Sequence, residues 1–280
     1  MNTVAIFGVG LIGGSFALAL RKAGFAGTIL GVGSESTLAR AQQLHIIDAG
    51  ASPRTAAQEA DLLYLAQPVH AILTTIAELN AWVRPGALVT DAGSTKRVIM
   101  ETAAKSLTRV QFLGGHPLAG KERRGADAAD ADLFEGRTYV LTPDSEAGLR
   151  TPAALEFQSW LKRIGSVPVV MSSAQHDSTV AVTSHLPQMA SVALAMLLCQ
   201  KDSVRDNVFG PALLDATRLA LSPYDIWRDI LATNTDAIDS ALIGYIRQLE
   251  TLRRDLGSAE MATHFRQAGA LASRLRGQET

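Results

Sequence analysis

The sequence predicts an α/β Rossmann-type N-terminal domain with a parallel sheet, followed by an all-α C-terminal domain. Three observations lead to this prediction. Short apolar segments alternate with helix-like stretches in the first half, a glycine-rich turn follows the first of them, and strand signals stop after Ser172. Alternation of strand and helix builds a parallel sheet through right-handed crossovers. We therefore expect one domain over residues 1–171 and a second, helical domain over residues 172–280.

Seven short apolar segments are predicted as strands, because continuous apolar runs of this length suit strands buried on both faces. In chain order they are Val4–Phe7, Thr28–Val32, Leu62–Leu65, Ala87–Thr90, Gln111–Leu113, Thr138–Leu141 and Val167–Val170. Four intervening stretches have helical patterns. These are Leu11–Ala23, Ser36–Gln43, Val69–Trp82 and Ala153–Ile164.

The second half contains only helix signals. The predicted helices are Ala174–Gln200, Pro211–Leu221, Ser222–Thr233 and Asp236–Leu256. At the start of the third helix, Ser222 is expected to cap the helix, Pro223 to occupy its first position, and Asp225 to reach back to the cap.

Composition and charge narrow the classes of partner. Hydrophobic residues make up 47% of the chain and charged residues 19%, which is globular composition and excludes a disordered or coiled-coil chain. The net charge of −1 leaves no broad basic field for nucleic acid or anionic lipid. A single cysteine, Cys199, excludes an internal disulfide and a cysteine-cluster metal site, and no metal is expected.

The sequence also gives an expectation for location. The apolar stretch Met189–Cys199 is shorter than the roughly 20 residues that a membrane span needs. The N-terminal residues lack the basic region of a signal peptide and lead straight into a strand. We therefore expect a cytoplasmic protein with no membrane or nucleic-acid partner.

A glycine-rich motif directly follows the first predicted strand and opens the first predicted helix. In this context its first glycine permits a tight turn, its second lets the backbone approach a pyrophosphate, and its third allows close packing of helix on strand. The sequence therefore predicts binding of NAD or NADP at this turn, rather than a glycine turn without a ligand. The residues expected to bind it are Gly8, Gly10, Leu11, Ile12 and Gly13.

The end of the second strand favours NADP over NAD. NAD-binding members of this fold place an acidic residue there, which binds the ribose 2′-hydroxyl. Here Gly33 or Ser34 occupies that place, and Glu35 comes one position later. Without a carboxylate there is no repulsion against a 2′-phosphate, which Ser34, Ser36 and Arg40 could bind. A Glu35 side chain pointing inward would reverse this preference.

Two polar segments follow strands at the carboxyl edge of the predicted sheet, where open α/β folds bind ligands. Asp91–Lys96 follows one strand, and Gly114–Gly120 with its central His116 follows the next. The imidazole of His116 is expected to point into the crevice, where a pKa near 6.5 would suit a general base. The alternative is a loop histidine bonded to backbone.

The helical half carries a second polar group. His185 and Gln188 are three residues apart and share a helix face, so both can line one pocket. His176 lies about half a revolution from His185 and is expected to serve the helix start. Arg218 is either a structural ion-pair partner of Asp215 or a bidentate carboxylate binder.

Five motifs in this order make the chain resemble the prephenate/arogenate dehydrogenase family of tyrosine biosynthesis. They are G-x-G-L-I-G-G-S, D-A-G-S-T-K, G-G-H-P-L-A-G, H-D…S-H-L-P and D-A-T-R…S-P…W, and they extend from residue 4 to about residue 235. The resemblance implies oxidative decarboxylation of arogenate or prephenate. A histidine takes the proton of the ring hydroxyl, a hydride passes to NAD(P)+, and CO2 leaves.

The resemblance also implies roles for individual residues. His116 matches the catalytic histidine, and Ser94 matches the serine that hydrogen-bonds to the reacting hydroxyl. Arg218 matches the arginine that binds a substrate carboxylate, while His185 and Trp227 match residues of the substrate pocket. The helical domain is expected to bind this small-molecule substrate and to form a homodimer.

Two departures from the family pattern concern the substrate. Many prephenate-type members read S-H-L-P-H, whereas Gln188 replaces the last histidine here, and Leu214 stands where some members have a basic residue. Glutamine is neutral and can both donate and accept, so it tolerates the ammonium of arogenate. We therefore expect arogenate to be accepted and prephenate to be used less well.

Two other classes of protein share part of this pattern. A β-hydroxyacid dehydrogenase would also have a Rossmann half followed by helices. Members of that class resemble one another in a catalytic lysine on the helical half, and the predicted helix over residues 174–200 contains no lysine. A non-enzymatic, nucleotide-sensing dimer needs only the glycine turn, and it leaves His116, Ser94 and Arg218 without a role. The dehydrogenase is the stronger interpretation.

Overall fold

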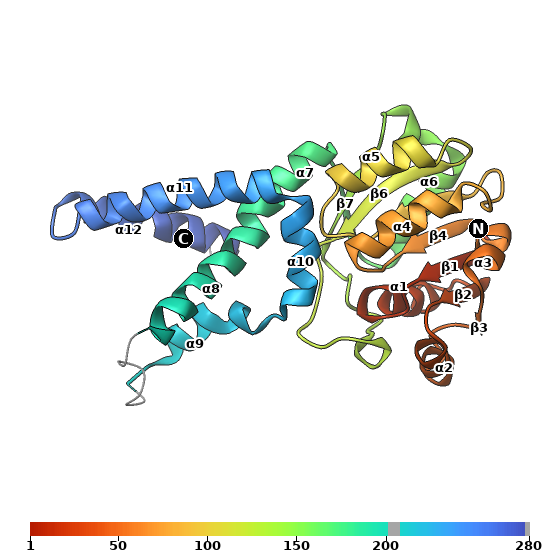
Figure 1. The fold of residues 1–280 in the computed structure, drawn as a ribbon, viewed down its shortest axis with the longest axis horizontal. Coiled ribbons are helices and arrows are strands. Elements are labelled where there is room, and N and C mark those ends of the chain that lie inside the picture. The colour runs from red at the N-terminus through yellow and green to blue at the C-terminus, as the bar shows by residue number, and fades with distance from the viewer. Residues whose placement is uncertain (201–207, 278–280) are drawn as a thin grey trace.

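The computed structural model describes residues 1–200 and 208–277. A sheet flanked by helices forms one lobe (the sheet lobe, residues 1–170), and helices alone form the other (the helical lobe, residues 173–200 and 208–277; Figure 1). The eight strands lie in the order β3-β2-β1-β4-β5-β6-β7-β8. The predicted fold class, a Rossmann-type domain followed by helices, is confirmed.

All seven predicted strands are present, together with one short additional strand, β3. The strands are β1 Thr3–Phe7, β2 Thr28–Val32, β3 Ala49–Gly50, β4 Leu62–Leu65, β5 Leu88–Asp91, β6 Gln111–Pro117, β7 Thr138–Thr142 and β8 Val167–Val170. The sheet is parallel except between β6 and β7, which run antiparallel. The expectation of a wholly parallel sheet is therefore wrong at this pair. The β6–β7 connection (residues 118–137) contains only a short 3-10 turn, and a parallel return requires a crossover that usually is an α-helix.

Helices cover both faces of the sheet because each strand buries side chains on both sides. Val4 and Ile6 of β1 belong to one apolar cluster, and Ala5 and Phe7 belong to the other. The first cluster includes side chains of α1, α2 and α6, and the second includes side chains of α3, α4 and α5. These helices are α1 Leu11–Lys22, α2 Glu35–Gln43, α3 Pro53–Glu59, α4 Val69–Leu79, α5 Arg97–Ser106 and α6 Pro152–Arg163.

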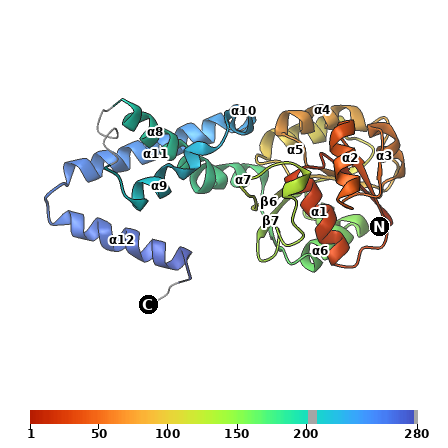
Figure 2. The same ribbon diagram turned by 90° about the horizontal axis from the view of Figure 1, so that it is seen from below.

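The helical lobe extends away from the sheet lobe, and α12 turns back at the far end of α11 and diverges from it (Figures 1 and 2). Its helices are α7 Ser173–Val180, α8 Leu186–Cys199, α9 Pro211–Thr217, α10 Tyr224–Thr233, α11 Thr235–Arg254 and α12 Glu260–Leu275. A π-turn over Ala181–His185 joins α7 to α8. The predicted cap of α10 is wrong: Pro223 is the N-cap residue with no side-chain cap bond among the described residues, and Asp225 pairs with Arg124 instead.

Two carboxylates of the helical lobe cap helices of the sheet lobe. Asp177 of α7 accepts hydrogen bonds from the backbone N–H groups of Lys96 and Arg97 at the start of α5, at 2.7 and 2.9 Å. Asp229 of α10 accepts from the N–H of His70 at the start of α4, at 3.0 Å. A helix N-terminus has unpaired N–H groups and a positive dipole end, so each contact stabilises both the helix and the junction of the lobes.

The continuous helix Ser173–Cys199 has 27 residues and, by length and composition alone, is apolar enough to cross a membrane. This helix is longer than the apolar stretch Met189–Cys199 that the sequence offered. It carries the buried polar side chains His176, Asp177 and His185. These groups bond to the sheet lobe and to α10–α11, and lipid could not replace those hydrogen bonds.

Candidate active site

The glycine turn between β1 and α1 has the geometry of a phosphate site. Gly8 has φ +91°, and a Cβ on Gly13 would lie 2.2 Å from the carbonyl oxygen of Gly8, so neither position accepts a larger residue without a shift. Above Gly10 there is open space, with no atom within 4 Å of the place of a Cβ. Among the described residues no side chain caps the start of α1. The turn and the helix end therefore fit a dinucleotide pyrophosphate.

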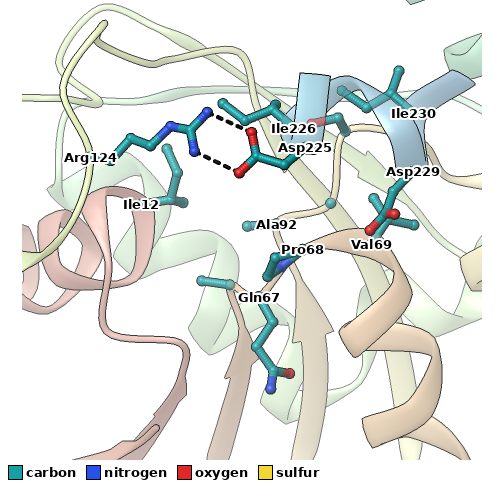
Figure 3. Close-up of a pocket in the computed structure, with 13 residues that line it drawn as sticks. Ile12, Gln67, Pro68, Val69, Ala92, Arg124, Asp225, Ile226, Asp229 and Ile230 are labelled. Carbon is teal, nitrogen blue, oxygen red and sulfur yellow. Dashed lines mark hydrogen bonds and ion pairs between the residues drawn. The ribbon is translucent and has the colours of Figure 1, made fainter. Parts of the chain in front are cut away.

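Two adjoining clefts run along the carboxyl edge of the sheet. The outer cleft, about 580 Å3, is lined in part by Gly8, Gly10, Ser34, Ser36 and Arg40. The inner cleft, about 310 Å3, lies between the glycine turn and α10 (Figure 3). Its lining residues are Ile12, Ala66, Gln67, Pro68, Val69, Ala92, Gly93, Ser94, Arg124, Asp225, Ile226, Asp229 and Ile230. Both clefts share residues 66–68, so one extended ligand can occupy them together.

The predicted cofactor residues have different surroundings. Ser34 caps α2 by accepting from the N–H of Thr37, and its hydroxyl lies 3.2 Å from that of Ser36. Arg40 is paired with Asp127 at the rim of the outer cleft. Glu35 is exposed and is not among the residues that line this cleft. The side chain of Leu11 and the backbone of Gly13 pack against the core and the turn, whereas Ile12 faces the inner cleft.

The turn after β5 is held by a buried ion pair. The carboxylate of Asp91 accepts from the ammonium of Lys96, from the N–H of Gly93 at 2.8 Å and from the N–H of Gly115 at 3.0 Å. Asp91 and Lys96 are both fully buried. Since Gly115 precedes His116, this carboxylate fixes the partly exposed Ser94, on the inner cleft, relative to the histidine.

His116 belongs to a relay of three side chains. Its Nδ1 lies 2.8 Å from Nε2 of His176, whose Nδ1 lies 2.7 Å from Oδ1 of Asp177. The prediction that His176 serves only the helix start is wrong. The π-turn between His176 and His185 advances fewer degrees per residue than an α-helix, so the half-revolution estimate does not hold.

The relay determines which nitrogen of His116 can accept a proton. Burial opposes the charge of Asp177, but hydrogen bonds from His176 and from backbone N–H groups keep the pKa of Asp177 below its ordinary value. The carboxylate therefore accepts from Nδ1–H of His176, whose Nε2 in turn accepts from Nδ1–H of His116. The lone pair on Nε2 of His116 is left for a ligand. Burial is the main cause that holds the pKa of His116 well below 6.5, and the neighbouring His176, Lys96 and His185 lower it further, so the ring is neutral at pH 7.

His185 and Trp227 extend this group. Asn234 donates to the carbonyl of Asp177 at 2.9 Å and lies 3.3 Å from Nδ1 of His185. The ring of His185 meets Trp227 edge to face, with centroids 5.8 Å apart. The structure thus brings His116, His185 and Trp227 into one connected cluster.

Gln188 and Arg218 form a second group. Nε2 of Gln188 donates to the carbonyl of Leu219 at 2.9 Å and so fixes the turn that carries Arg218. Arg218 pairs with Glu122 of the β6–β7 connection at 3.0 Å. The alternative predicted from the sequence, an ion pair with Asp215, is therefore wrong. This connection begins directly after β6, the strand that carries His116. It therefore joins the cluster around His116 to the group of Gln188 and Arg218, and among the described residues no hydrogen bond links the two directly.

The pKa of His185 predicts a loss of stability in acid. Burial lowers the pKa of His185 to about 4, whereas an unfolded histidine titrates near 6.5. Between these values the unfolded chain binds a proton that the folded chain does not, so the free energy of unfolding falls as the pH falls from 6.5 toward 4, by up to about 3 kcal/mol. Urea unfolding across this pH range should show that the free energy of unfolding depends less steeply on pH in His185→Gln than in the wild type. An unchanged slope would contradict the assignment.

Both halves of the chain are similar to known proteins. The family profile described as "Prephenate dehydrogenase, nucleotide-binding domain" matches residues 16–167, and that described as "Prephenate dehydrogenase, dimerization domain" matches residues 172–268. The chain is 33% identical to a prephenate dehydrogenase of Bacillus subtilis, over 95% of this chain and 73% of that protein. It is 31% identical to a cyclohexadienyl dehydrogenase of Zymomonas mobilis, over 95% and 93% of the two chains.

Solved structures show the same likeness. Prephenate dehydrogenase from Aquifex aeolicus, in complex with hydroxyphenyl propionate and NAD+, superimposes with a TM-score of 0.90 at 30% identity, over 98% of both chains. Arogenate dehydrogenase from Synechocystis has a TM-score of 0.83 at 29% identity, over 98% and 99%. A 3-hydroxyisobutyrate dehydrogenase of Mycobacterium tuberculosis reaches only 0.59 at 18% identity and shares the fold alone. The chain belongs to the prephenate dehydrogenase family.

Proposed function

We propose that this protein catalyses the NAD(P)+-dependent oxidative decarboxylation of arogenate or prephenate, which yields tyrosine or 4-hydroxyphenylpyruvate. The observation that carries the proposal is the relay from Asp177 through His176, which leaves Nε2 of a neutral His116 to accept a proton. Relatives named for prephenate, cyclohexadienyl and arogenate substrates support the same reaction class.

The proposed roles follow from the positions of the side chains. Nε2 of His116 takes the proton of the ring hydroxyl, and Ser94, on the inner cleft, donates a hydrogen bond to the same oxygen. The bound dinucleotide supplies the hydride acceptor. The imidazolium that forms on His116 is stabilised by the dipole of His176 and the charge of Asp177. Loss of CO2 then makes the ring aromatic.

Gln188 favours acceptance of arogenate. The carbonyl of Leu219 can only accept, so the amide nitrogen of Gln188 must face it, and Oε1 is the group left to accept from a ligand. An ammonium is a donor only, which matches this oxygen. We expect kcat/KM for arogenate to equal or exceed that for prephenate, followed through the absorbance of the reduced nicotinamide. A preference for prephenate above about a hundredfold would contradict this assignment.

Arg218 is proposed to bind a substrate carboxylate, in exchange for Glu122. Arg218→Ala should raise KM by about 30- to 1,000-fold, in line with the loss of a charge-assisted pair, with little change in unfolding free energy because the Arg218–Glu122 pair is exposed. Asp215→Asn is the matched control, since Asp215 is exposed near the end of α9, three residues before Arg218. A destabilised Arg218→Ala protein with normal KM would show that the residue is structural.

The cofactor is proposed to be NADP+ in preference to NAD+. Ser34, Ser36 and Arg40 line the outer cleft, while Glu35 does not. Binding of the 2′-phosphate would exchange the Asp127 carboxylate on Arg40 for a phosphate. Arg40→Gln should therefore raise the dissociation constant of NADP+ and leave that of NAD+ unchanged in calorimetry. Equal losses for both would contradict this role.

The helical domain, residues 172–280, is proposed to form a homodimer, and the protein is proposed to act in the cytoplasm. Residues 172–268 match the dimerization domain of the family. Large apolar side chains are exposed on its helices, among them Met196, Leu197, Ile246, Phe265 and Leu275. Light scattering should give twice the chain mass of 29.7 kDa, and a mass of one chain would contradict the dimer.

A further inference from the structure

We propose that Arg124 binds the phosphates of the dinucleotide, and that Asp225 holds its guanidinium over the cleft until they arrive. The inference rests on the proposed dinucleotide site and adds a binding residue outside the glycine motif. None of the five motifs that carry the family resemblance contains Arg124.

Arg124 and Asp225 meet across the mouth of the inner cleft. Nη1 of Arg124 donates to Oδ2 of Asp225 at 2.9 Å, and Nη2 donates to Oδ1 at 3.2 Å. Arg124 comes from the β6–β7 connection of the sheet lobe, and Asp225 from the first turn of α10 in the helical lobe. Figure 3 shows the guanidinium above Ile12, the residue of the glycine turn that faces this cleft. The paired guanidinium and the start of α1 therefore both border the inner cleft.

The chain that follows Arg124 continues along the outer cleft. Gly125 and Asp127 line that cleft together with Gly8 and Gly10. A ligand that occupies both clefts must pass between this segment and the glycine turn. In this fold the pyrophosphate is the part of a dinucleotide that lies at the glycine turn. The passage next to Arg124 is thus the part of the site where the ligand carries its negative charge.

The charges around the inner cleft explain why an arginine is needed there. Two carboxylates line it, Asp225 and Asp229, and both would repel a pyrophosphate. Asp229 is engaged by the N–H of His70 and by Arg228. Asp225 is neutralised by Arg124, whose hydrogen bond holds the pKa of that carboxyl below its ordinary value. A guanidinium binds phosphate with the same two-pronged geometry as carboxylate, so Arg124 can exchange one for the other.

The pair also has a purely mechanical interpretation, as a clasp between the lobes. Both side chains are largely exposed, and an exposed ion pair contributes little to stability. The two interpretations predict different effects of removing the Asp225 charge on dinucleotide binding. If the pair is a clasp, loss of either partner has the same effect. If Arg124 binds phosphate, loss of Arg124 weakens dinucleotide binding, whereas loss of the Asp225 charge removes a competitor and strengthens it.

The experiment measures dissociation constants of NAD+ and NADP+ by calorimetry without substrate. Arg124→Gln should raise both constants by the same factor, about 5- to 50-fold, and Asp225→Asn should lower both by about 3- to 10-fold. Arg124→Lys, which keeps the charge but not the fork, should lie between wild type and Arg124→Gln. Arg123→Gln is the control, because the exposed Arg123 makes no hydrogen bond or ion pair with any described residue.

Three outcomes would overturn the proposal. Weaker binding in both Arg124→Gln and Asp225→Asn would establish the clasp. Unchanged binding in Arg124→Gln would exclude a phosphate contact. A loss confined to NADP+ would move the contact to the 2′-phosphate. A wild-type protein that binds neither dinucleotide would overturn the proposed function itself, which separates that failure from the others.

Discussion

Replacing His116 by asparagine should lower kcat by about 10²- to 10⁴-fold and leave the dissociation constants of the dinucleotides unchanged. The imidazole is the proposed proton acceptor, and it takes its orientation from His176 rather than from the glycine turn. Steady-state assays give kcat, and calorimetry gives the binding constants. Because burial holds the pKa of His116 well below 6.5, the wild-type rate should also stay flat as the pH falls from 7 to 6.5.

His45→Asn is a suitable control for this variant. His45 is exposed at the end of α2, and its φ of +53° is a conformation that asparagine adopts readily. The substitution removes an imidazole without touching the cleft, so kcat should not change. Retained turnover in His116→Asn would show that another group takes the proton.

The second large effect concerns stability. Lys96→Met should lower the free energy of unfolding by about 3–5 kcal/mol, because it leaves the Asp91 carboxylate buried without its counter-charge. Burial lowers the pKa of Lys96, and the charge of Asp91 opposes that effect, so the buried ammonium is stabilised by the carboxylate beside it. Urea unfolding measures the change.

Lys105→Met provides the matched control, since Lys105 lies exposed in the last turn of the same helix, α5. Its effect should stay within about 0.5 kcal/mol. The double variant Asp91→Asn/Lys96→Met should recover part of the loss, because it removes the unpaired charge. A loss below about 1 kcal/mol in Lys96→Met would contradict the argument.

The sequence predicts the strands well because a strand covered on both faces leaves a continuous apolar run. β3 was missed, since Ala49–Gly50 is too short to carry such a pattern. The direction of β7 was missed for a different reason. An apolar run is the same whether the strand is parallel or antiparallel. The two directions are distinguished by the connection before β7, which has a short 3-10 turn in place of a crossover helix.

The site residues were likewise predicted only where a local sequence pattern marks them. His116 was predicted because Gly and Pro neighbours at a strand end place a histidine at the edge of the sheet. His176 was placed wrongly, because helical periodicity takes no account of the π-turn at Ala181–His185. Glu122 and Asn234 carried no local signal at all. Their partners, Arg218 and His185, lie 96 and 49 residues away, and only the tertiary fold brings them together.

The capping of α5 by Asp177 and of α4 by Asp229 limits how the enzyme can move. Swinging the lobes apart would uncover two helix ends at once, and would break the hydrogen bond between His116 and His176 that sets the tautomer of His116. Opening by a hinge between the lobes is therefore disfavoured. The β6–β7 connection, in contrast, is tied to the helical lobe by exposed ion pairs, which cost little free energy to break.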